Sequence, residues 1–359
     1  MKFPIWIRQS TFFSFLTIVA TVAVSCQSGT DSYQNGIAKS KVGDWNGAIA
    51  DFDNAIQTKP DSAEAFHERG WAKALRRDFD GALSDYNKAI AIKPDFAAAY
   101  TGRAIIKDIK QDLNGAMADY NSAIELNPGY WAAYYNRGLL QEEQGNLDGA
   151  ISDLTKAISL RPDDSRGYVA RGVLRARKGN LEPAIADFTI SLKFAPNYFA
   201  AYYQRASVKE EKGDLAGALA DCDKAIQLQP HSARAYNLRA WVQFLQKKFD
   251  LALKDANRAI QLDPEFPNGY GTKGWIRWGK GDLGGAREDL NKSIELAKPN
   301  ASDAEMIEDQ GLLYFMDGNY QKAIDSWQSA VAQYPSLKSD LQPWIEKAKE
   351  KQKSQKRSP

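Results

Sequence analysis

Histidine and cysteine are the side chains that most often carry acid-base, nucleophilic or metal chemistry near neutral pH, and this sequence holds few of them. Its 359 residues include two histidines, His67 and His231, and two cysteines, Cys26 and Cys222. None of them stands at the spacing of a metal site, and no nucleophile, base and orienting group can be assembled from them. The sequence therefore predicts a protein that is not an enzyme and that uses no cofactor and no metal.

Paired carboxylates are the other candidates for acid-base work. Glu142-Glu143 and Glu210-Glu211 recur near the end of a predicted helix, two steps before a turn. Because that end of the helix is polar, we interpret both pairs as solvated faces rather than as sites.

A second group of charged residues repeats with a fixed period. The arginines are Arg69, Arg103, Arg137, Arg171, Arg205 and Arg239, and the aspartates are Asp51, Asp85, Asp119, Asp153, Asp187, Asp221, Asp255 and Asp289. Each arginine stands beside a small residue at a predicted helix crossing, where a partly buried guanidinium needs a carboxylate to offset its desolvation. We expect a ladder of Arg and Asp pairs between helices. The alternative is an arginine stripe that binds phosphate or carboxylate ligands.

The elements that must position these residues follow the same period of 34. It is kept by alanines at Ala48, Ala82, Ala116, Ala150, Ala184, Ala218, Ala252 and Ala286, and by prolines from Pro60 to Pro264. In the unit from Trp131 to Asp164, apolar residues at helical spacing are interrupted at Gly145-Asn146 and resume until Pro162. Gly145 suits a left-handed residue that closes the first helix, and Asn146 can cap the second. Each unit is therefore a helix, a tight turn and a second helix.

These residues resemble the tetratricopeptide repeat, whose pattern places a large residue, a Gly, an Ala, an aromatic and a Pro at fixed steps in 34. The resemblance implies an all-α fold, an α-solenoid superhelix of nine tetratricopeptide helix-turn-helix repeats with a C-terminal capping helix. The repeats span 29–62, 63–96, 97–130, 131–164, 165–198, 199–232, 233–266, 267–301 and 304–337. The first and last depart from the aromatic start with Ser32 and Ile307.

The residues after the repeats, 338–359, are expected to form the capping helix and a basic tail. Leu341, Trp344, Ile345 and Ala348 share one face of that helix, which would cover the exposed end of the array. The lysines of the tail are interpreted as a solvated helix end, with contact to anionic lipid head groups as the alternative.

Residues 1–25 do not belong to the repeats and are expected to be a signal peptide. Lys2 and Arg8 precede an apolar run that is too short to span a bilayer and that ends in small residues at Ala23 and Ser25. The residues before Cys26 resemble a bacterial lipobox, which implies lipidation of Cys26 and a lipidated tether over 26–30. Ordinary cleavage after Ser25 is the alternative. We expect an exported protein, lipid-anchored in the cell envelope and facing the periplasm, or else secreted or periplasmic and soluble.

Charge and cysteine content restrict the partners. The formal net charge is +2, and removal of Lys2 and Arg8 with the leader makes the two signs equal. Nucleic acid, which demands a basic stripe, is therefore not an expected partner. Cys222 takes the place that Phe52, Tyr86 and Phe188 hold in other repeats, so we expect it to be a packed core thiol and expect no disulfide.

The resemblance also indicates where a partner would bind, because related proteins line a concave groove with the first helix of each repeat. At two of these positions the last three repeats carry large apolar groups, Trp241, Trp275 and Leu312 in one row and Phe244, Trp278 and Phe315 in the other. We predict that these six residues form a peptide-binding groove. The alternative is that some of them pack between repeats.

The sequence thus favours a non-catalytic protein-protein interaction scaffold or assembly adaptor in the bacterial cell envelope, which binds a peptide segment of an unnamed protein partner. The membrane would be reached through the lipid anchor at Cys26. A self-associating structural envelope protein, and so a homo-oligomer, is the alternative. An enzyme or carbohydrate binder that uses the acidic and aromatic groove is a third hypothesis.

Overall fold

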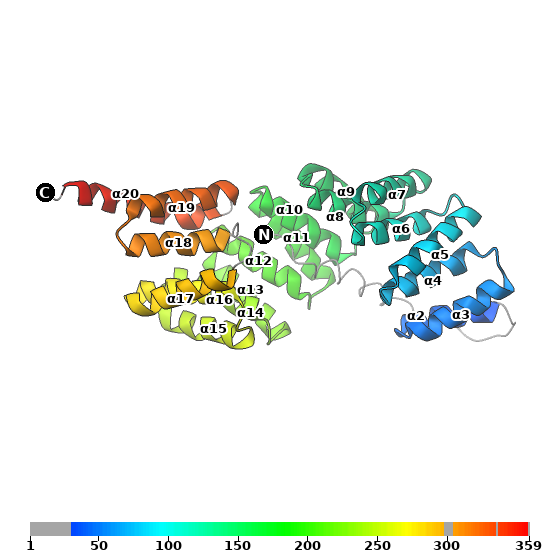
Figure 1. The fold of residues 1–359 in the computed structure, drawn as a ribbon, viewed down its shortest axis with the longest axis horizontal. Coiled ribbons are helices and arrows are strands. Elements are labelled where there is room, and N and C mark those ends of the chain that lie inside the picture. Colours follow the sequence, from blue (N-terminus) through cyan, green and yellow to red (C-terminus); the bar gives the residue numbers. More distant parts are fainter. Residues whose placement is uncertain (1–29, 298–303, 335–336, 358–359) are drawn as a thin grey trace. The chain divides into compact units, whose positions relative to one another are not determined.

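A computed structural model of the chain describes residues 30–297, 304–334 and 337–357. Within these ranges it contains nineteen helices and no strand, which confirms the all-α solenoid (Figure 1). The expected signal peptide, Cys26, most of the tether and the connection around Pro299 lie outside the described residues.

The chain divides after Arg161 into two compact units. The described part of the first unit contains eight helices in four pairs. They are α2 (Thr30–Lys41), α3 (Trp45–Thr58), α4 (Ala63–Leu75), α5 (Phe79–Ile92), α6 (Ala97–Ile109), α7 (Leu113–Leu126), α8 (Trp131–Glu143) and α9 (Leu147–Leu160).

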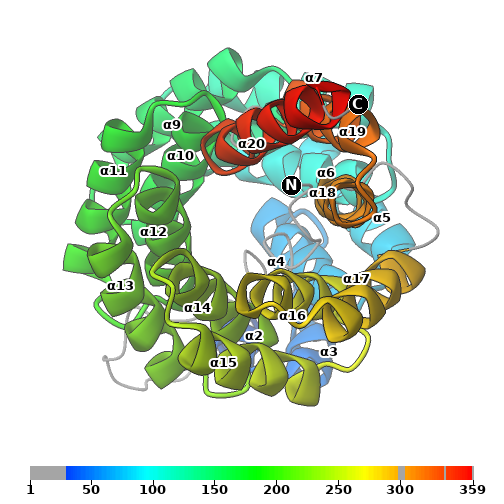
Figure 2. The same cartoon turned by 90° about the vertical axis from the view of Figure 1, so that its left-hand side faces the viewer.

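The second unit continues the pattern with five pairs and one further helix. The pairs are formed by α10 (Ser165–Arg177), α11 (Leu181–Phe194), α12 (Phe199–Glu211), α13 (Leu215–Leu228), α14 (Ala233–Leu245), α15 (Phe249–Leu262), α16 (Pro267–Lys280), α17 (Leu283–Ala297), α18 (Ala304–Met316) and α19 (Tyr320–Gln333). The last helix is α20 (Lys338–Arg357), which packs against α19. Figure 2 shows that, in this unit, the first helices α12, α14, α16 and α18 lie inside and the second helices α13, α15 and α17 lie outside.

The turn inside each pair has the geometry that the sequence predicts. Gly145 has a φ of 79°, in the left-handed region that glycine adopts without a steric cost. The side chain of Asn146 accepts a hydrogen bond of 3.1 Å from the backbone N–H of Gly149, which caps the second helix. Three pairs place a residue with a side chain in the same conformation: Arg77, Gln111 and Lys247, with φ of 66°, 66° and 60°. Each of these three turns carries a strain of about 1 kcal/mol.

The interior of most pairs is built from a large side chain opposite a small one, and the pairs with Cys222 and Ala256 have a small residue on both helices. A Cβ atom placed on Gly172 would lie 2.8 Å from the ring of Phe188, and one on Gly311 would collide with the indole of Trp327. Glycine is therefore required at these crossings for the two helices to approach. Cys222 is 1% exposed and burial raises the pKa of its thiol to about 12, which confirms that it is a packed core residue.

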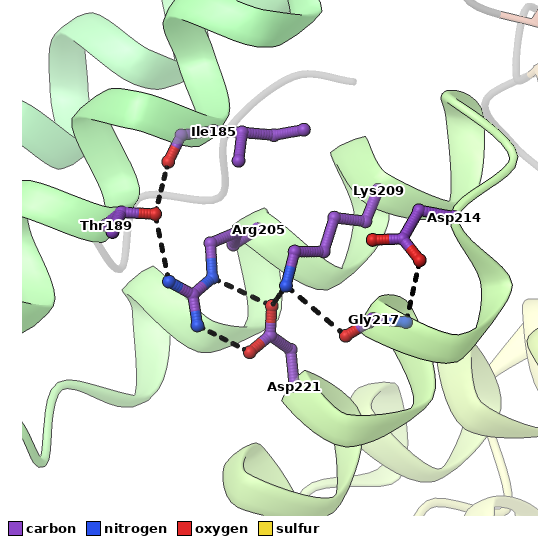
Figure 3. Close-up of polar contacts among 7 residues, drawn as sticks. All are labelled: Ile185, Thr189, Arg205, Lys209, Asp214, Gly217 and Asp221. Carbon is purple, nitrogen blue, oxygen red and sulfur yellow. Dashed lines mark hydrogen bonds and ion pairs between the residues drawn. The ribbon is translucent and has the colours of Figure 1, made fainter.

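The six arginines pair with six of the eight aspartates and form the ladder that the sequence predicts, of which Figure 3 shows one rung. The other two aspartates differ, because Asp51 pairs with Lys39 and Asp289 with Lys273 and Arg277. Arg205 donates two hydrogen bonds to Asp221, of 2.8 and 2.7 Å, and a third of 3.0 Å to Thr189 in the preceding pair. Lys209 completes the rung with an ion pair of 2.8 Å to the same carboxylate. The other two-bond rungs join Arg69 to Asp85, Arg103 to Asp119, Arg137 to Asp153, Arg171 to Asp187 and Arg239 to Asp255. The ladder therefore ties the two helices of a pair to each other and, in most rungs, to the pair before.

None of the helices in the described ranges has the length and apolar character needed to cross a bilayer.

Candidate functional site

The six residues predicted to line a groove lie on the inner side of the second unit, but only three of them reach its surface. Trp241 on α14, Trp278 on α16 and Phe315 on α18 are partly exposed. Phe244, Trp275 and Leu312 are 6%, 2% and 0% exposed. The prediction that these last three contact a ligand is corrected, since side chains this deeply buried cannot be touched from outside. We call the surface formed by Trp241, Trp278 and Phe315 the inner aromatic surface.

Trp275 is the centre of the cluster beneath this surface. Its ring centroid lies 6.0 Å from those of Trp241 and Trp278, in edge-to-face contact with both, and 6.4 Å from that of Trp327. Its indole N–H donates a hydrogen bond of 3.1 Å to the buried carboxylate of Asp309. Trp275 thus fixes the orientation of the partly exposed rings above it.

The last helix, α20, lies on the inner aromatic surface as well as on the end of the array. The face that carries Leu341, Ile345 and Ala348 is 2%, 2% and 0% exposed, which confirms the predicted cap. The ring of Trp344 reaches further, to 5.0 Å from Trp278 and 5.7 Å from Trp275 between centroids. Lys347 places its ammonium 5.1 Å from the Trp278 ring.

Trp344 and Lys347 are functional candidates that the sequence analysis missed. The sequence alone places Trp344 on the capping face and Lys347 in the solvated tail. Their spacing of three residues on a helix, one aromatic and one basic, was the signal that they could grip one aromatic side chain together.

Two neighbouring carboxylates, Glu210 and Glu211, lie beside this surface at the end of α12. Glu210 at the end of α12 is 8% exposed and accepts a hydrogen bond of 3.2 Å from the indole N–H of Trp241. Burial, and then the charge of Asp340 on α20, raises the pKa of Glu210 to about 8 and that of the neighbouring Glu211 to about 7. The interpretation of Glu210 as a solvated face is therefore wrong. Trp241 of α14 contacts it, and that contact is not visible in the local sequence.

The geometry of the inner aromatic surface suits binding. His67 lies 3.2 Å from the adjacent Glu68 and packs against the Phe96 ring, as a structural histidine does. Among the described residues no group of three His, Cys, Asp or Glu side chains is placed to hold a metal ion. The inner aromatic surface presents partly exposed indoles beside carboxylates, a combination that suits apolar and cationic side chains.

A solenoid of helix pairs with such a surface is typical of repeat proteins that bind other proteins. Tetratricopeptide repeat families match residues 33–97, 109–145, 131–164, 169–232, 233–266 and 272–337. The chain belongs to the tetratricopeptide repeat family and is a protein-protein interaction scaffold. No curated protein matches it as a close relative.

Solved structures share the fold at low sequence identity. A tetratricopeptide repeat protein from Parabacteroides merdae is 21% identical with a TM-score of 0.50, and the match covers 70% of this chain and 99% of that one. The pilF protein of Pseudomonas aeruginosa is 20% identical with a TM-score of 0.52, over 56% of this chain and 92% of that one. Yeast Tom70 is 19% identical with a TM-score of 0.50, over 92% and 71%. These similarities concern the fold alone.

Proposed function

We propose that the protein is a non-catalytic scaffold or assembly adaptor of the bacterial cell envelope that binds a segment of a partner protein on its inner aromatic surface. One observation carries the choice of surface: an amphipathic helix, the chain's own α20, already lies there through Trp344. A surface that accepts one such helix has the shape and chemistry to accept another.

The side chains support this choice of site. Binding hot spots are enriched in Trp and Arg and are concentrated in a few well-packed residues surrounded by a protective rim. Trp241 and Trp278 are held in place by edge-to-face contacts with Trp275, so they lose little conformational freedom when a partner binds. Glu211, which is partly exposed beside them, favours a segment that carries positive charge.

Site-specific photocrosslinking in the native host tests the site. A photoreactive phenylalanine analogue at position 241 keeps an aromatic ring on the inner surface, and the same group at Leu251 serves as the control. Leu251 is 53% exposed on the outer helix α15. We expect position 241 to form an adduct with one protein that position 251 does not form. The same adducts from both positions, or none from position 241, would overturn the assignment.

The envelope anchor is a second part of the proposal, and it rests on the sequence around Cys26. The expected result is that Cys26→Ser moves the protein from the membrane fraction to the soluble fraction. If the Cys26→Ser protein is processed normally and stays with the membrane, Cys26 is not the anchor.

The alternative, a self-associating envelope protein, makes a different prediction in both experiments. In that case the adduct from position 241 would contain only this chain, and the mass of the purified protein in solution would rise with concentration. We expect a mass that does not depend on concentration.

A further inference from the structure

We propose that Lys347 of α20, held between the indoles of Trp278 and Trp344, binds an acidic side chain of the partner segment. The segment that fits carries an aspartate or glutamate flanked by apolar residues, and α20 forms one wall of the partner site as well as the cap of the array. This inference rests on the proposed function and adds to it the charge of the ligand and the residue that recognises it.

The first step is the position of the Lys347 ammonium, which lies at the corner between two indoles. It is 5.1 Å from the centroid of the Trp278 ring and 4.8 Å from that of the Trp344 ring. The two rings are 5.0 Å apart between centroids, with an angle of 73° between their planes. A cation is attracted to the negative face of an aromatic ring. Lys347 is therefore placed by two contacts, although it lies at an exposed position of its helix.

The second step is that the two indoles are themselves fixed. Trp278 is in edge-to-face contact with Trp275 and with Phe315, at 6.0 and 5.9 Å between ring centroids. Trp344 lies 5.7 Å from the same Trp275, which is 2% exposed. The rings that hold the ammonium thus rest on the core of the second unit, and the charge of Lys347 has a defined place on the inner aromatic surface.

The third step is that this charge is available. Lys347 forms no ion pair with any residue in the part of the chain that the structure describes. Lys349, two residues further along α20, pairs instead with Glu346 at 2.8 Å. A ring face attracts the ammonium without offering it an oxygen acceptor. The N–H donors of Lys347 can therefore bond to an acceptor that a partner brings.

The fourth step is that such a lysine binds an anion better than a free surface lysine does. A long side chain loses rotamer freedom when a ligand fixes it, and the two rings have restricted Lys347 before a ligand arrives. A partner that covers the indoles also excludes water from the new ion pair, which strengthens the attraction.

The fifth step is the kind of anion. A phosphate group carries a charge of about −1.5 to −2 at pH 7 and is typically bound by arginine clusters. Lys347 offers a single positive charge, and its neighbours at this corner are the apolar rings of Trp278 and Trp344. A carboxylate with apolar residues beside it matches both features.

The two ends of the inner aromatic surface therefore differ in charge. At the end of α12, the partly exposed Glu211 follows the glutamate that accepts the indole N–H of Trp241. Contacts through Trp275 lead from Trp241 to Trp278, beside which Lys347 lies. A segment bound across this surface carries a basic residue near α12 and an acidic residue near α20.

The experiment selects from a library of random dodecapeptides displayed on phage, with the full chain as bait at pH 7. Two variants serve as parallel baits. Lys347→Met keeps an aliphatic stem on the rings and removes the charge, and Lys347→Glu reverses the charge. We expect the wild type to enrich peptides with an Asp or Glu beside apolar residues, and Lys347→Met to lose this preference. Lys347→Glu should enrich Lys or Arg at the same place.

Affinity measurements with the most enriched wild-type peptide make the test quantitative. Fluorescence anisotropy compares this peptide with a copy in which the acidic residue is replaced by its amide. The replacement should weaken binding to the wild-type chain about tenfold. It should change binding to Lys347→Met less than about twofold, because the two changes remove the same ion pair.

Matched controls test whether the effect belongs to Lys347. Lys351→Met, at an exposed position of the same helix, should keep the wild-type preference for acidic residues. Glu211→Gln should lose the preference for a basic residue and keep that for an acidic one. Circular dichroism checks that each variant is folded, and Lys347→Gln replaces either Lys347 variant that is not.

The inference is wrong if the wild type enriches no peptides, if the enriched peptides lack an acidic residue, or if Lys347→Met enriches acidic residues as the wild type does. None of these results touches the proposed function if position 241 still captures one protein. Absence of that adduct overturns the proposed function, and the peptide selection still decides whether Lys347 binds a carboxylate.

Discussion

The Arg–Asp ladder and the aromatic cluster of the last pairs are organised in opposite ways. Six pairs, from α4 and α5 to α14 and α15, contain the same rung, with the arginine and the aspartate 16 residues apart. The cluster around Trp275 is formed once, from residues that differ from pair to pair and from a helix outside the repeats. A contact that recurs in six pairs serves what those pairs share, which is stacking. The contacts made once are where an individual function can lie.

The largest effect is expected at the base of the aromatic cluster. Trp327→Ala removes a fully buried side chain whose indole N–H donates to the carbonyl of Glu308, and Gly311 leaves the resulting cavity open. We expect a loss of about 3–5 kcal/mol in the free energy of unfolding, measured by denaturant titration. Trp344→Ala, at the partly exposed edge of the same cluster, should cost less than half as much. Equal losses would mean that the inner aromatic surface is simply core.

The next effect tests the ladder. Arg137→Ala leaves Asp153, whose side chain is 8% exposed, without its two hydrogen bonds of 2.7 and 2.8 Å. Removing the partner of this nearly buried carboxylate should lower the free energy of unfolding by about 2–4 kcal/mol. The loss is smaller than for a fully buried ion pair because Arg137 itself is partly solvated. Lys156→Ala, at an exposed position on the same pair, should change it by less than about 0.5 kcal/mol. If Arg137→Ala leaves the melting temperature unchanged but abolishes the photocrosslinked adduct from position 241, the arginines form a binding stripe and not a structural ladder.

The carboxylates beside the cluster predict a pH dependence that the ladder does not share. The pKa values of Glu210 and Glu211 are raised in the folded protein, to about 8 and about 7, so both bind protons more tightly there than in the unfolded chain. Their contribution is fully present below the unfolded pKa of about 4.5 and is lost as the pH rises through 7 to 8. Wild-type stability should therefore fall between pH 5.5 and 9.

The matched variant for this test is Glu210→Gln, which keeps the acceptor oxygen for Trp241 and removes the titration. Its stability should depend less on pH across the same window than that of the wild type. If the difference in the free energy of unfolding between Glu210→Gln and the wild type stays constant with pH, the raised pKa of Glu210 is wrong.

The smallest effect lies in the turns. Gln111 has a positive φ of 66° where most pairs have glycine. Gln111→Gly relieves that strain but adds freedom to the unfolded chain, so we expect a net gain of at most about 1 kcal/mol in a thermal unfolding scan. Gln111→Ala keeps the strain and should give no gain.

The sequence predicts the fold and the ladder because both repeat with the period of 34. The positions of Gly145 and Asn146 in the repeat predict the turn, and those of Arg137 and Asp153 predict the ion pair between the two helices. The burial of Phe244 and Leu312 depends on the helices that pack around them. The contact of Trp241 with Glu210 joins residues 31 positions apart, and the contact of Trp344 with Trp278 joins α20 to α16. Neither contact recurs in the repeat, so periodicity carries no information about it.

The measurement that tests the account most directly combines the two regions in one protein. The crosslinker at position 241 is introduced together with either Trp278→Ala or Arg205→Ala, and both the melting temperature and the adduct yield are recorded at a temperature where each variant is folded. We predict that Trp278→Ala reduces the yield at least about tenfold, whereas Arg205→Ala lowers the melting temperature and keeps the adduct. Loss of the adduct with Arg205→Ala and its retention with Trp278→Ala would contradict the division between a structural ladder and a binding surface.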